Sequence, residues 1–469
     1  MELFLDPDDH RPQAVQLYEQ LREAINDGRL GPGDRLTPSR TVASELGISR
    51  STVTEVYGRL GAEGYLEGHA GGGSVVSAAQ WPARPRLPVA ALSPTPRASA
   101  TRAYATDQQA TAAFNCRPGH LDPALFPVAA WRRCAIAALD RPINQYGDPA
   151  GTPELRTALA HWVTRSRGVA ATAAELFVTA GAGHAVDLIA RVLVDPGDLV
   201  AVEEPGYPVV LELLRSHGLR VVGVPVDEHG LVVDAIPAAT RLVYVTPSHQ
   251  FPLGMVMSRQ RRLELLAWAR TTGAAIIEDD YDSEFRYTAR PLEPLQRLDR
   301  DGRVLYVGTF AKTLSAGLRL GFMIAPPSLL PALRAIRAVV DWCPPTATQA
   351  AMTQFVTDGH LDRHLRRTRA VYTERRRLMW DALSRHLPSE YDRLPAAAGL
   401  HLTVRANADQ TGPEPIAAIR ERGLLVSSLS RTYAFTEPTP GFLLGFAGLP
   451  TPLVVPAIRA LGTALAEEP

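Results

Sequence analysis

The chain has 469 residues with a hydrophobic content of 46%, and its 49 basic residues balance its 49 acidic ones. This length predicts more than one domain, and the balanced charge excludes a global field that recruits nucleic acid or membranes. No apolar run reaches about 18 residues, so we predict neither a membrane span nor a secretory signal. The three cysteines follow no metal-ligand spacing, so we expect no metal site and free thiols in a reducing cytoplasm.

The first 77 residues predict a small helical domain that ends in a hairpin. Apolar spacing and turn residues predict three helices, at 13–26, from Ser39 to Leu46 and from Ser49 to about Glu63. Ser39 and Ser49 are the expected N-caps of the second and third helices. Two short strands, 64–67 and 74–77, flank a glycine-rich tip. This order predicts a winged helix-turn-helix at residues 1–77.

Two runs of this domain resemble the DNA-binding head of the GntR family. They are Leu-Thr-Pro-Ser-Arg at 36–40 and Ile-Ser-Arg-Ser-Thr-Val at 48–53. The resemblance implies a double-stranded DNA operator as partner, contacted from the helix starts by Arg40, Ser49, Arg50, Ser51 and Thr52. The domain contains more acidic than basic residues, whereas DNA-binding domains are usually basic. A winged helix used for protein contacts therefore remains an alternative.

Residues 78–112 predict a linker. The segment is rich in Ala, Pro, Ser, Thr and Arg and has no hydrophobic periodicity. In polyproline form, at about 3.1 Å per residue, it could reach on the order of 100 Å. That reach is sufficient to place the N-terminal head on a partner subunit.

Strands and helices alternate in residues 113–469, which predicts an α/β fold with a mostly parallel sheet covered by helices. Buried strands are expected at 176–179, 199–202, 242–246, 274–277 and 304–308. We expect a smaller α+β subdomain at about 346–469. Ligands of such sheets collect at the carboxyl ends of the strands, so the loops that follow these strands are the candidate site.

Lys312, which follows the strand at 304–308, is the only lysine in the sequence. The guanidinium groups of the arginines that replace lysine elsewhere stay protonated. A desolvated lysine can lose its proton and condense with an aldehyde. Lys312 is therefore a candidate for a covalent link to a cofactor.

The segment 278–282, Glu-Asp-Asp-Tyr-Asp, places carboxylates after another apolar strand. Such a carboxylate can pair with the protonated pyridine nitrogen of pyridoxal phosphate, although an acidic cluster could also bind magnesium. Together with Gly-Thr-Phe-Ala-Lys-Thr-Leu at 308–314, the segment resembles the aminotransferase-like half of the MocR/GabR family of regulators. That family shares the fold of aspartate aminotransferase, and the resemblance runs from about Phe114 to the C-terminus.

The resemblance implies pyridoxal 5'-phosphate as cofactor and a role for each matching residue. Lys312 would be the catalytic residue that forms the internal aldimine, Asp279 would pair with the ring nitrogen, and Tyr281 would bond the phenolic oxygen. Tyr207 would stack on the ring. The phosphate would be bound by Gly181, Ala182, Thr309 and Arg319, and by Tyr146 of the partner subunit.

Two residues depart from aminotransferases of this fold. Phe251 replaces a common asparagine, and Leu443 replaces an arginine that grips the substrate carboxylate. Arg431 is a candidate substitute for that arginine. We therefore predict a cytoplasmic, homodimeric transcriptional regulator that senses an amine, an amino acid or pyridoxal phosphate. An active aminotransferase with an accessory DNA-binding head is the alternative.

Overall fold

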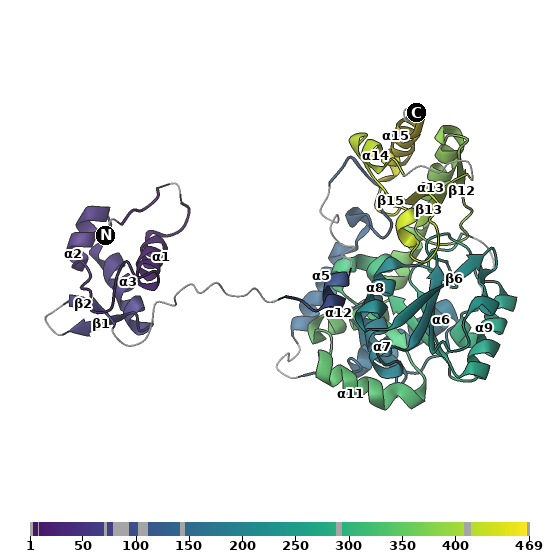
Figure 1. Ribbon diagram of the computed structural model, residues 1–469, viewed down its shortest axis with the longest axis horizontal. Helices are drawn as coiled ribbons and strands as arrows, with labels where there is room; N and C mark the ends of the chain where they lie inside the picture. The colour runs from purple at the N-terminus through teal and green to yellow at the C-terminus, as the bar shows by residue number, and fades with distance from the viewer. Residues whose placement is uncertain are drawn as a thin grey trace. The chain divides into compact units, whose positions relative to one another are not determined.

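The computed structural model describes residues 3–7, 9–69, 73–77, 93–101, 111–140, 146–287, 293–407 and 414–466. The chain divides into two compact units, Met1–Pro94 and Thr95–Pro469 (Figure 1). Most of the predicted linker and the tip of the predicted wing lie outside the described residues. Within the described part of the linker, α4 (Pro96–Ala100) is a short helix. No helix of the described residues combines the length and apolar character that crossing a membrane requires.

The N-terminal unit contains three helices and a two-stranded antiparallel hairpin. Its elements are α1 (Gln13–Asn26), α2 (Ser39–Leu46), α3 (Arg50–Ala62), β1 (Leu66–His69) and β2 (Gly73–Val76). Apolar side chains of the helices, among them Leu17, Val42 and Val53, pack into one core with the hairpin. The predicted winged helix-turn-helix is confirmed.

The helix boundaries of this unit correct one predicted cap. Ser39 is the first residue of α2 rather than its N-cap, and Pro38 occupies the cap position without a side-chain hydrogen bond. The pyrrolidine ring fixes φ of Pro38, so the chain enters the helix without a polar cap. Ser49 caps α3 as predicted, because its hydroxyl accepts a hydrogen bond from the N–H of Thr52 at 3.1 Å.

The larger unit is built around an eight-stranded sheet. Its strands, in spatial order, are β4 (Leu176–Thr179), β11 (Gly321–Ile324), β10 (Val304–Thr309), β9 (Ala275–Asp280), β8 (Leu242–Val245), β5 (Leu199–Glu204), β6 (Arg220–Asp227) and β7 (Gly230–Leu231). The strands from β10 to β6 are parallel, whereas β11 and β7 run antiparallel to their neighbours. The predicted mostly parallel sheet is confirmed.

Helices cover both faces of this sheet, and successive strand residues alternate between the faces. Leu305 and Val307 of β10 pack in one core cluster with α7 (Ala182–Leu193), α8 (Pro208–Ser216) and α11 (Leu330–Val340). Val304 and Tyr306 face the other side, where the covering helices are α6 (Pro153–Arg167), α9 (Arg259–Thr272) and α12 (Thr346–Thr357). Burial on both faces explains why these strands are apolar throughout.

A smaller antiparallel sheet forms the C-terminal part of this unit. Its strands are β12 (Tyr391–Arg393), β13 (His401–Ala406), β16 (Gly441–Gly445) and β15 (Ser427–Ser428). The accompanying helices are α13 (His360–His386), α14 (Ile416–Glu421) and α15 (Val454–Ala466). The segment that follows the predicted linker joins this part, because β3 (Phe114–Asn115) pairs with β14 (Leu424–Leu425). Two further helices are α5 (Val128–Leu139) and α10 (Leu295–Leu298).

Candidate functional site

Lys312 lies in the turn Ala311–Ser315, directly after the carboxyl end of β10. Burial lowers the pKa of its ammonium group, and the negative charges of Asp282 and Asp279 oppose that shift. Gly119 approaches the amine so closely, at φ +83°, that an added Cβ would collide with Nζ. The direction of this shift suits an amine that must lose its proton to react, and Gly119 makes the site around it narrow.

Asp279 is the next-to-last residue of the neighbouring strand β9, and its two carboxylate oxygens differ in their surroundings. Its Oδ2 accepts a hydrogen bond from the Tyr244 hydroxyl at 2.6 Å. Its Oδ1 is buried and has no hydrogen-bond partner among the described residues. Burial raises the pKa of Asp279 to about 7, although the Tyr244 hydrogen bond and the charge of Lys312 act in the opposite direction, so a further positive partner would stabilise its ionised form. A protonated ring nitrogen fits this requirement.

The other carboxylates of the acidic segment point to different partners. Asp280 forms an ion pair with Arg167, and Glu278 lies 3.7 Å from Arg262. Successive strand residues face opposite sides of the sheet, which separates these groups from Asp279. Because these carboxylates face different partners, they do not converge on one point as the ligands of a magnesium ion would, which argues against the magnesium site that the sequence left open.

A cradle for an anion lies where β4 meets α7. Gly181 makes this turn at φ +105°, and the first peptide N–H groups of α7, including that of Ala182, follow it. The Arg319 guanidinium lies 3.7 Å from the position of a Cβ added at Gly181. The Thr309 hydroxyl accepts a hydrogen bond from the Ala311 N–H at 3.1 Å at the end of β10. Helix N-terminal N–H groups and a guanidinium together fit a phosphate.

Aromatic rings connect the remaining predicted residues, with one exception. The ring centroids of Tyr207 and Phe251 are 5.4 Å apart, and those of Phe251 and Tyr281 are 6.4 Å apart. Tyr146, in contrast, is 84% exposed, and its ring packs at a tilt against Trp342 with the ring centroids 5.0 Å apart. Within one chain, the structure does not bring Tyr146 to the other predicted residues.

Leu443 lies in a closed apolar cluster rather than beside an anion-binding group. It is buried with Leu253 and Leu429, and Phe251 packs against the three leucines. The expected substitute, Arg431, lines a small pocket together with Tyr207. Arg431 thus lies at the pocket beside Tyr207, and the side chains that pack together around Leu443 in this cluster are apolar.

Sequence reasoning missed the partners of Tyr281. The Tyr281 hydroxyl donates to the main-chain oxygen of His249 at 3.0 Å, and His249 Nδ1 lies 3.0 Å from Asp282 Oδ1. His249 follows β8 and Asp282 follows β9, which are adjacent parallel strands. The sequence did contain a signal for this contact, because both residues follow apolar strands and the carboxyl ends of neighbouring parallel strands lie close together.

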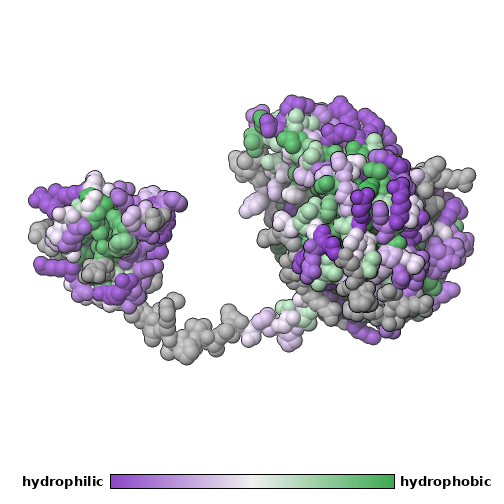
Figure 2. Space-filling model, turned by 90° about the horizontal axis from the view of Figure 1, so that it is seen from above, coloured by the Kyte–Doolittle hydropathy of each residue, from purple (hydrophilic) through white to green (hydrophobic). Residues whose placement is uncertain are grey.

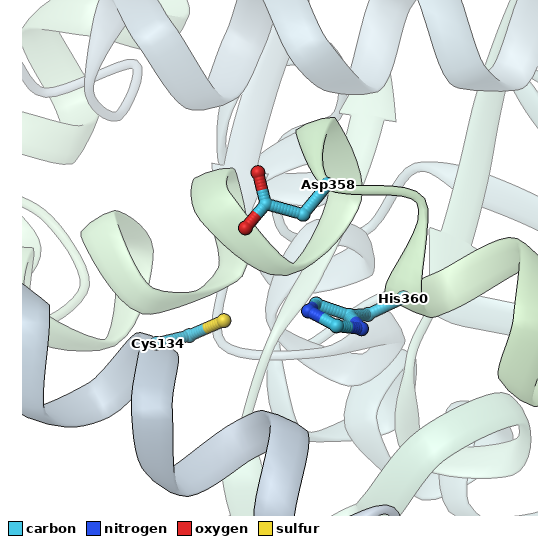
Figure 3. A group of neighbouring side chains, drawn as sticks. All are labelled: Cys134, Asp358 and His360. Atoms are coloured by element: carbon cyan, nitrogen blue, oxygen red, sulfur yellow. The ribbon is translucent and has the colours of Figure 1, made fainter.

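A second group of polar side chains, Cys134, Asp358 and His360, lies between α5 and the start of α13 (Figure 3). Their potential ligand atoms lie within 4.8 Å of one another. However, Arg363 donates to Nδ1 of His360 at 2.7 Å, which leaves the hydrogen of the neutral ring on Nε2. Burial also raises the pKa of the Cys134 thiol. Both effects oppose metal binding, so these side chains are better explained as packing between helices.

In the N-terminal unit, the predicted DNA-contacting residues occupy the first turns of α2 and α3. Arg40 and Arg50 are exposed and form no ion pair with the described residues. Three other arginines of this unit pair with carboxylates, namely Arg11, Arg29 and Arg59. Ser51 is exposed, whereas the Ser49 hydroxyl and Thr52 are engaged in capping α3.

Comparisons with known proteins match both units. Residues 13–76 match the family of bacterial regulatory proteins of the gntR type, and residues 120–454 match aminotransferase class I and II. The chain is 35% identical to the probable rhizopine catabolism regulatory protein MocR of Rhizobium meliloti, over 98% of this chain and 95% of that protein. It is 32% identical to the pyridoxine biosynthesis transcriptional regulator PdxR of Corynebacterium glutamicum, over 93% of each. Kynurenine aminotransferase of Pyrococcus horikoshii matches 80% of this chain and 96% of its own, at 25% identity and a TM-score of 0.72.

Proposed function

The chain belongs to the MocR/GabR-type family of regulators, in which a gntR-type head is fused to an aminotransferase class I and II domain, and we propose that it senses its effector at Lys312. It is a DNA-binding transcriptional regulator with pyridoxal phosphate as its cofactor. When bound, this cofactor supplies an aldehyde that condenses with amines. The observation that carries the proposal is a partly buried Lys312 amine that lies within the electrostatic field of Asp279, whose buried Oδ1 has no hydrogen-bond partner among the described residues.

Each group of the cofactor has a candidate partner in the chain. Lys312 would attach the aldehyde carbon, Asp279 would receive the ring N–H, and Tyr281 would bond the phenolic oxygen. Tyr207 would cover one face of the ring. The phosphate would be bound by the N–H groups of Gly181 and Ala182, the Thr309 hydroxyl, Arg319, and Tyr146 of the partner subunit.

The effector is an amine or amino acid that reacts at the cofactor, or pyridoxal phosphate itself. The apolar cluster around Leu443 supports sensing, because it provides no guanidinium to hold a substrate carboxylate in a fixed orientation. A ligand can still shift a conformational equilibrium when its affinity differs between two states. Binding at Lys312 would thereby change the affinity of the head for its operator.

The head would bind the operator through the first turns of α2 and α3. Arg40 and Arg50 support this role, because no carboxylate among the described residues neutralises them. Their exposure at helix starts suits contacts with phosphates and base edges in the major groove. We infer that the protein acts in the cytoplasm, where the operator is accessible.

Exposed apolar side chains support a homodimer. Several of them lie on α5 and at or near the end of α11, namely Val128, Ile136, Leu139, Val339, Trp342 and Tyr146. Figure 2 shows hydrophilic residues over most of the visible surface, with smaller apolar areas between them. Exposed apolar side chains that gather on neighbouring elements are typical of protein interfaces. Dimerisation would also supply the second chain's Tyr146 to each phosphate site.

Absorbance and DNA binding measured on the same protein would test this proposal. Purified protein should gain a visible band with pyridoxal phosphate, and a library of amines should alter that band. Binding to a labelled fragment from upstream of its own gene should change at the same ligand concentrations. A band that responds to amines while DNA binding stays constant would contradict the coupling. Response to the cofactor alone would identify it as the effector.

A further inference from the structure

His249, Asp282 and Tyr281 form a compact hydrogen-bonded group at the edge of the cofactor site. His249 Nδ1 lies 3.0 and 3.2 Å from the two carboxylate oxygens of Asp282. The same Nδ1 lies 2.9 Å from the Tyr281 hydroxyl, which also donates to the main-chain oxygen of His249. With a hydrogen on Nδ1, the imidazole donates to the carboxylate and holds the tyrosine oxygen in place. The tyrosine hydrogen can then turn toward a ligand.

The protein encloses the His249 ring tightly. The side chains of His249 and Asp282 are 1% and 2% exposed. Gly399, at φ +87°, lies against the ring so closely that an added Cβ would overlap it, and a Cβ at Gly254 would stand 3.6 Å from Nε2. The Leu400 N–H donates to Asp282 at 3.2 Å. A ring held this firmly can fix the position of the tyrosine oxygen.

The second nitrogen of the His249 ring, Nε2, forms no hydrogen bond with the described residues. This nitrogen is also buried. A buried polar atom that makes no bond is unfavourable, so an apolar side chain would suit packing alone better. The presence of an imidazole therefore indicates a task for Nδ1.

Charged and titratable groups surround Lys312 from several elements. Asp279 and Asp282 face it from the end of β9 and favour its protonated form. His120 and His401 also lie in its electrostatic field, from the Gly119 segment and from β13. Burial lowers the pKa of His401 to about 4, which leaves this imidazole neutral near pH 7. Asp282 is thus a charge near Lys312 and also the anchor of His249.

We propose that His249 and Asp282 are positioning residues that fix the Tyr281 hydroxyl, and that they set the pH at which the cofactor-bearing Lys312 nitrogen gains its proton. The proposal rests on attachment of pyridoxal phosphate at Lys312. Once the Lys312 nitrogen has lost its proton, that proton no longer balances the negative charge on the phenolic oxygen of the cofactor. The Tyr281 hydroxyl, by donating a hydrogen bond to this oxygen, would stabilise the deprotonated form. The hydroxyl lowers the midpoint of the titration, whereas the charge of Asp282 raises it.

Substitutions separate these two effects. His249→Leu removes the donor and should raise the midpoint of the visible band by about one pH unit, as Tyr281→Phe should. His249→Asn is the matched control, because its amide can still donate to Asp282 and Tyr281, and it should stay near the wild type. Asp282→Asn keeps an acceptor for Nδ1 but removes the charge, so it should lower the midpoint by about one unit.

The experiment is a pH titration of the absorbance of the full-length protein loaded with pyridoxal phosphate. If His249 acts through Tyr281, the double variant His249→Leu/Tyr281→Phe should shift no further than Tyr281→Phe alone. Additive shifts, or equal midpoints in all variants, would overturn the proposal. Asp282→Asn, which keeps the shape of the site, provides a second test of the pair if His249→Leu does not fold.

Two further outcomes are distinguishable. A wild-type protein without a visible band would contradict cofactor attachment, and thus the proposed function, rather than the role of the pair. The ligand atoms of His249, Asp282 and His401 lie within 4.8 Å of one another, so bound metal is a competing explanation. A midpoint that changes on treatment with a chelator would overturn the proposal, and an unchanged midpoint would support it.

Discussion

Replacing Asp279 by asparagine should weaken cofactor binding while leaving the fold intact. Asparagine keeps the size of the side chain and an oxygen for the Tyr244 hydroxyl, which lies 2.6 Å from Oδ2 in the structure. The substitution removes the negative charge, including its share on the buried, unpartnered Oδ1. The affected interaction is therefore the expected bond to the protonated ring nitrogen.

The size of the effect follows from the kind of hydrogen bond that is removed. A hydrogen bond to a charged group contributes about 1.5–3 kcal/mol, and 1.4 kcal/mol corresponds to about tenfold in Kd. We expect the Kd for pyridoxal phosphate to rise about 10- to 150-fold in Asp279→Asn. Tyr244→Phe removes a neutral donor and keeps the carboxylate, so its effect should stay below about tenfold.

Equilibrium dialysis against pyridoxal phosphate, with absorbance spectra of the loaded proteins, measures these constants. Thermal unfolding of the cofactor-free variants provides the control for folding. Burial raises the pKa of Asp279 to about 7, so near pH 6 the cofactor-free wild type already holds a neutral carboxyl. The cofactor-free Asp279→Asn variant should therefore have the same thermal stability as the cofactor-free wild type near pH 6. A Kd within about threefold of the wild type, or an equal effect of Tyr244→Phe, would refute the pairing of Asp279 with the ring nitrogen.

The remaining predictions concern attachment, DNA binding, pH dependence and turnover. Lys312→Ala and Lys312→Arg should give no borohydride-reducible adduct, and a pyridoxyl group on any other peptide would contradict this assignment. Arg40→Ala and Arg50→Ala should weaken DNA binding and reduce the salt slope by about one for each phosphate that is no longer neutralised, whereas unchanged affinity and slope would exclude this surface. Burial raises the pKa of Glu203 from 4.5 to about 7. Between pH 4.5 and about pH 7, Glu203 is therefore protonated in the folded protein and ionised in the unfolded protein. The unfolding free energy should therefore fall as pH rises through this window, and urea titrations should show a smaller fall in Glu203→Gln. Steady-state transamination should stay below about 1 per second, and faster turnover would favour an active aminotransferase.

The sequence predicted the features that depend on residue type and local order. The fold class followed from alternating apolar strands and helices, and the structure confirms the mostly parallel sheet. Lys312 and Asp279 were identifiable because an amine and a strand-end carboxylate perform chemistry that few other residues can. The structure brings them close enough for the Asp279 charge to act on the Lys312 amine. Their roles toward the cofactor remain predictions.

Contacts that depend on strand order could not be read from the sequence. His249 and Asp282 are separated by 33 positions, and only the pairing of β8 with β9 makes them neighbours. The glycine at 399, which admits the His249 ring, comes from a third distant segment. The cap of α2 shows the same limit on a local scale, because Ser39 was the expected N-cap and the structure starts the helix at Ser39, one residue after Pro38.

The apolar cluster at Leu443 connects the site to regulation. An amine that displaces Lys312 from the cofactor aldehyde would be held at its nitrogen, while the side chains of Leu253, Leu429 and Leu443 offer its carboxylate no hydrogen bond. A reacting carbon displaced by about 1 Å can lose on the order of a hundredfold in rate. Attachment needs only the amine, whereas turnover also needs a fixed carbon, so we expect the cluster to lower the rate of turnover more than the affinity for the amine. A regulator benefits from that difference, because a ligand that is not consumed continues to shift the equilibrium between two states for as long as it is present.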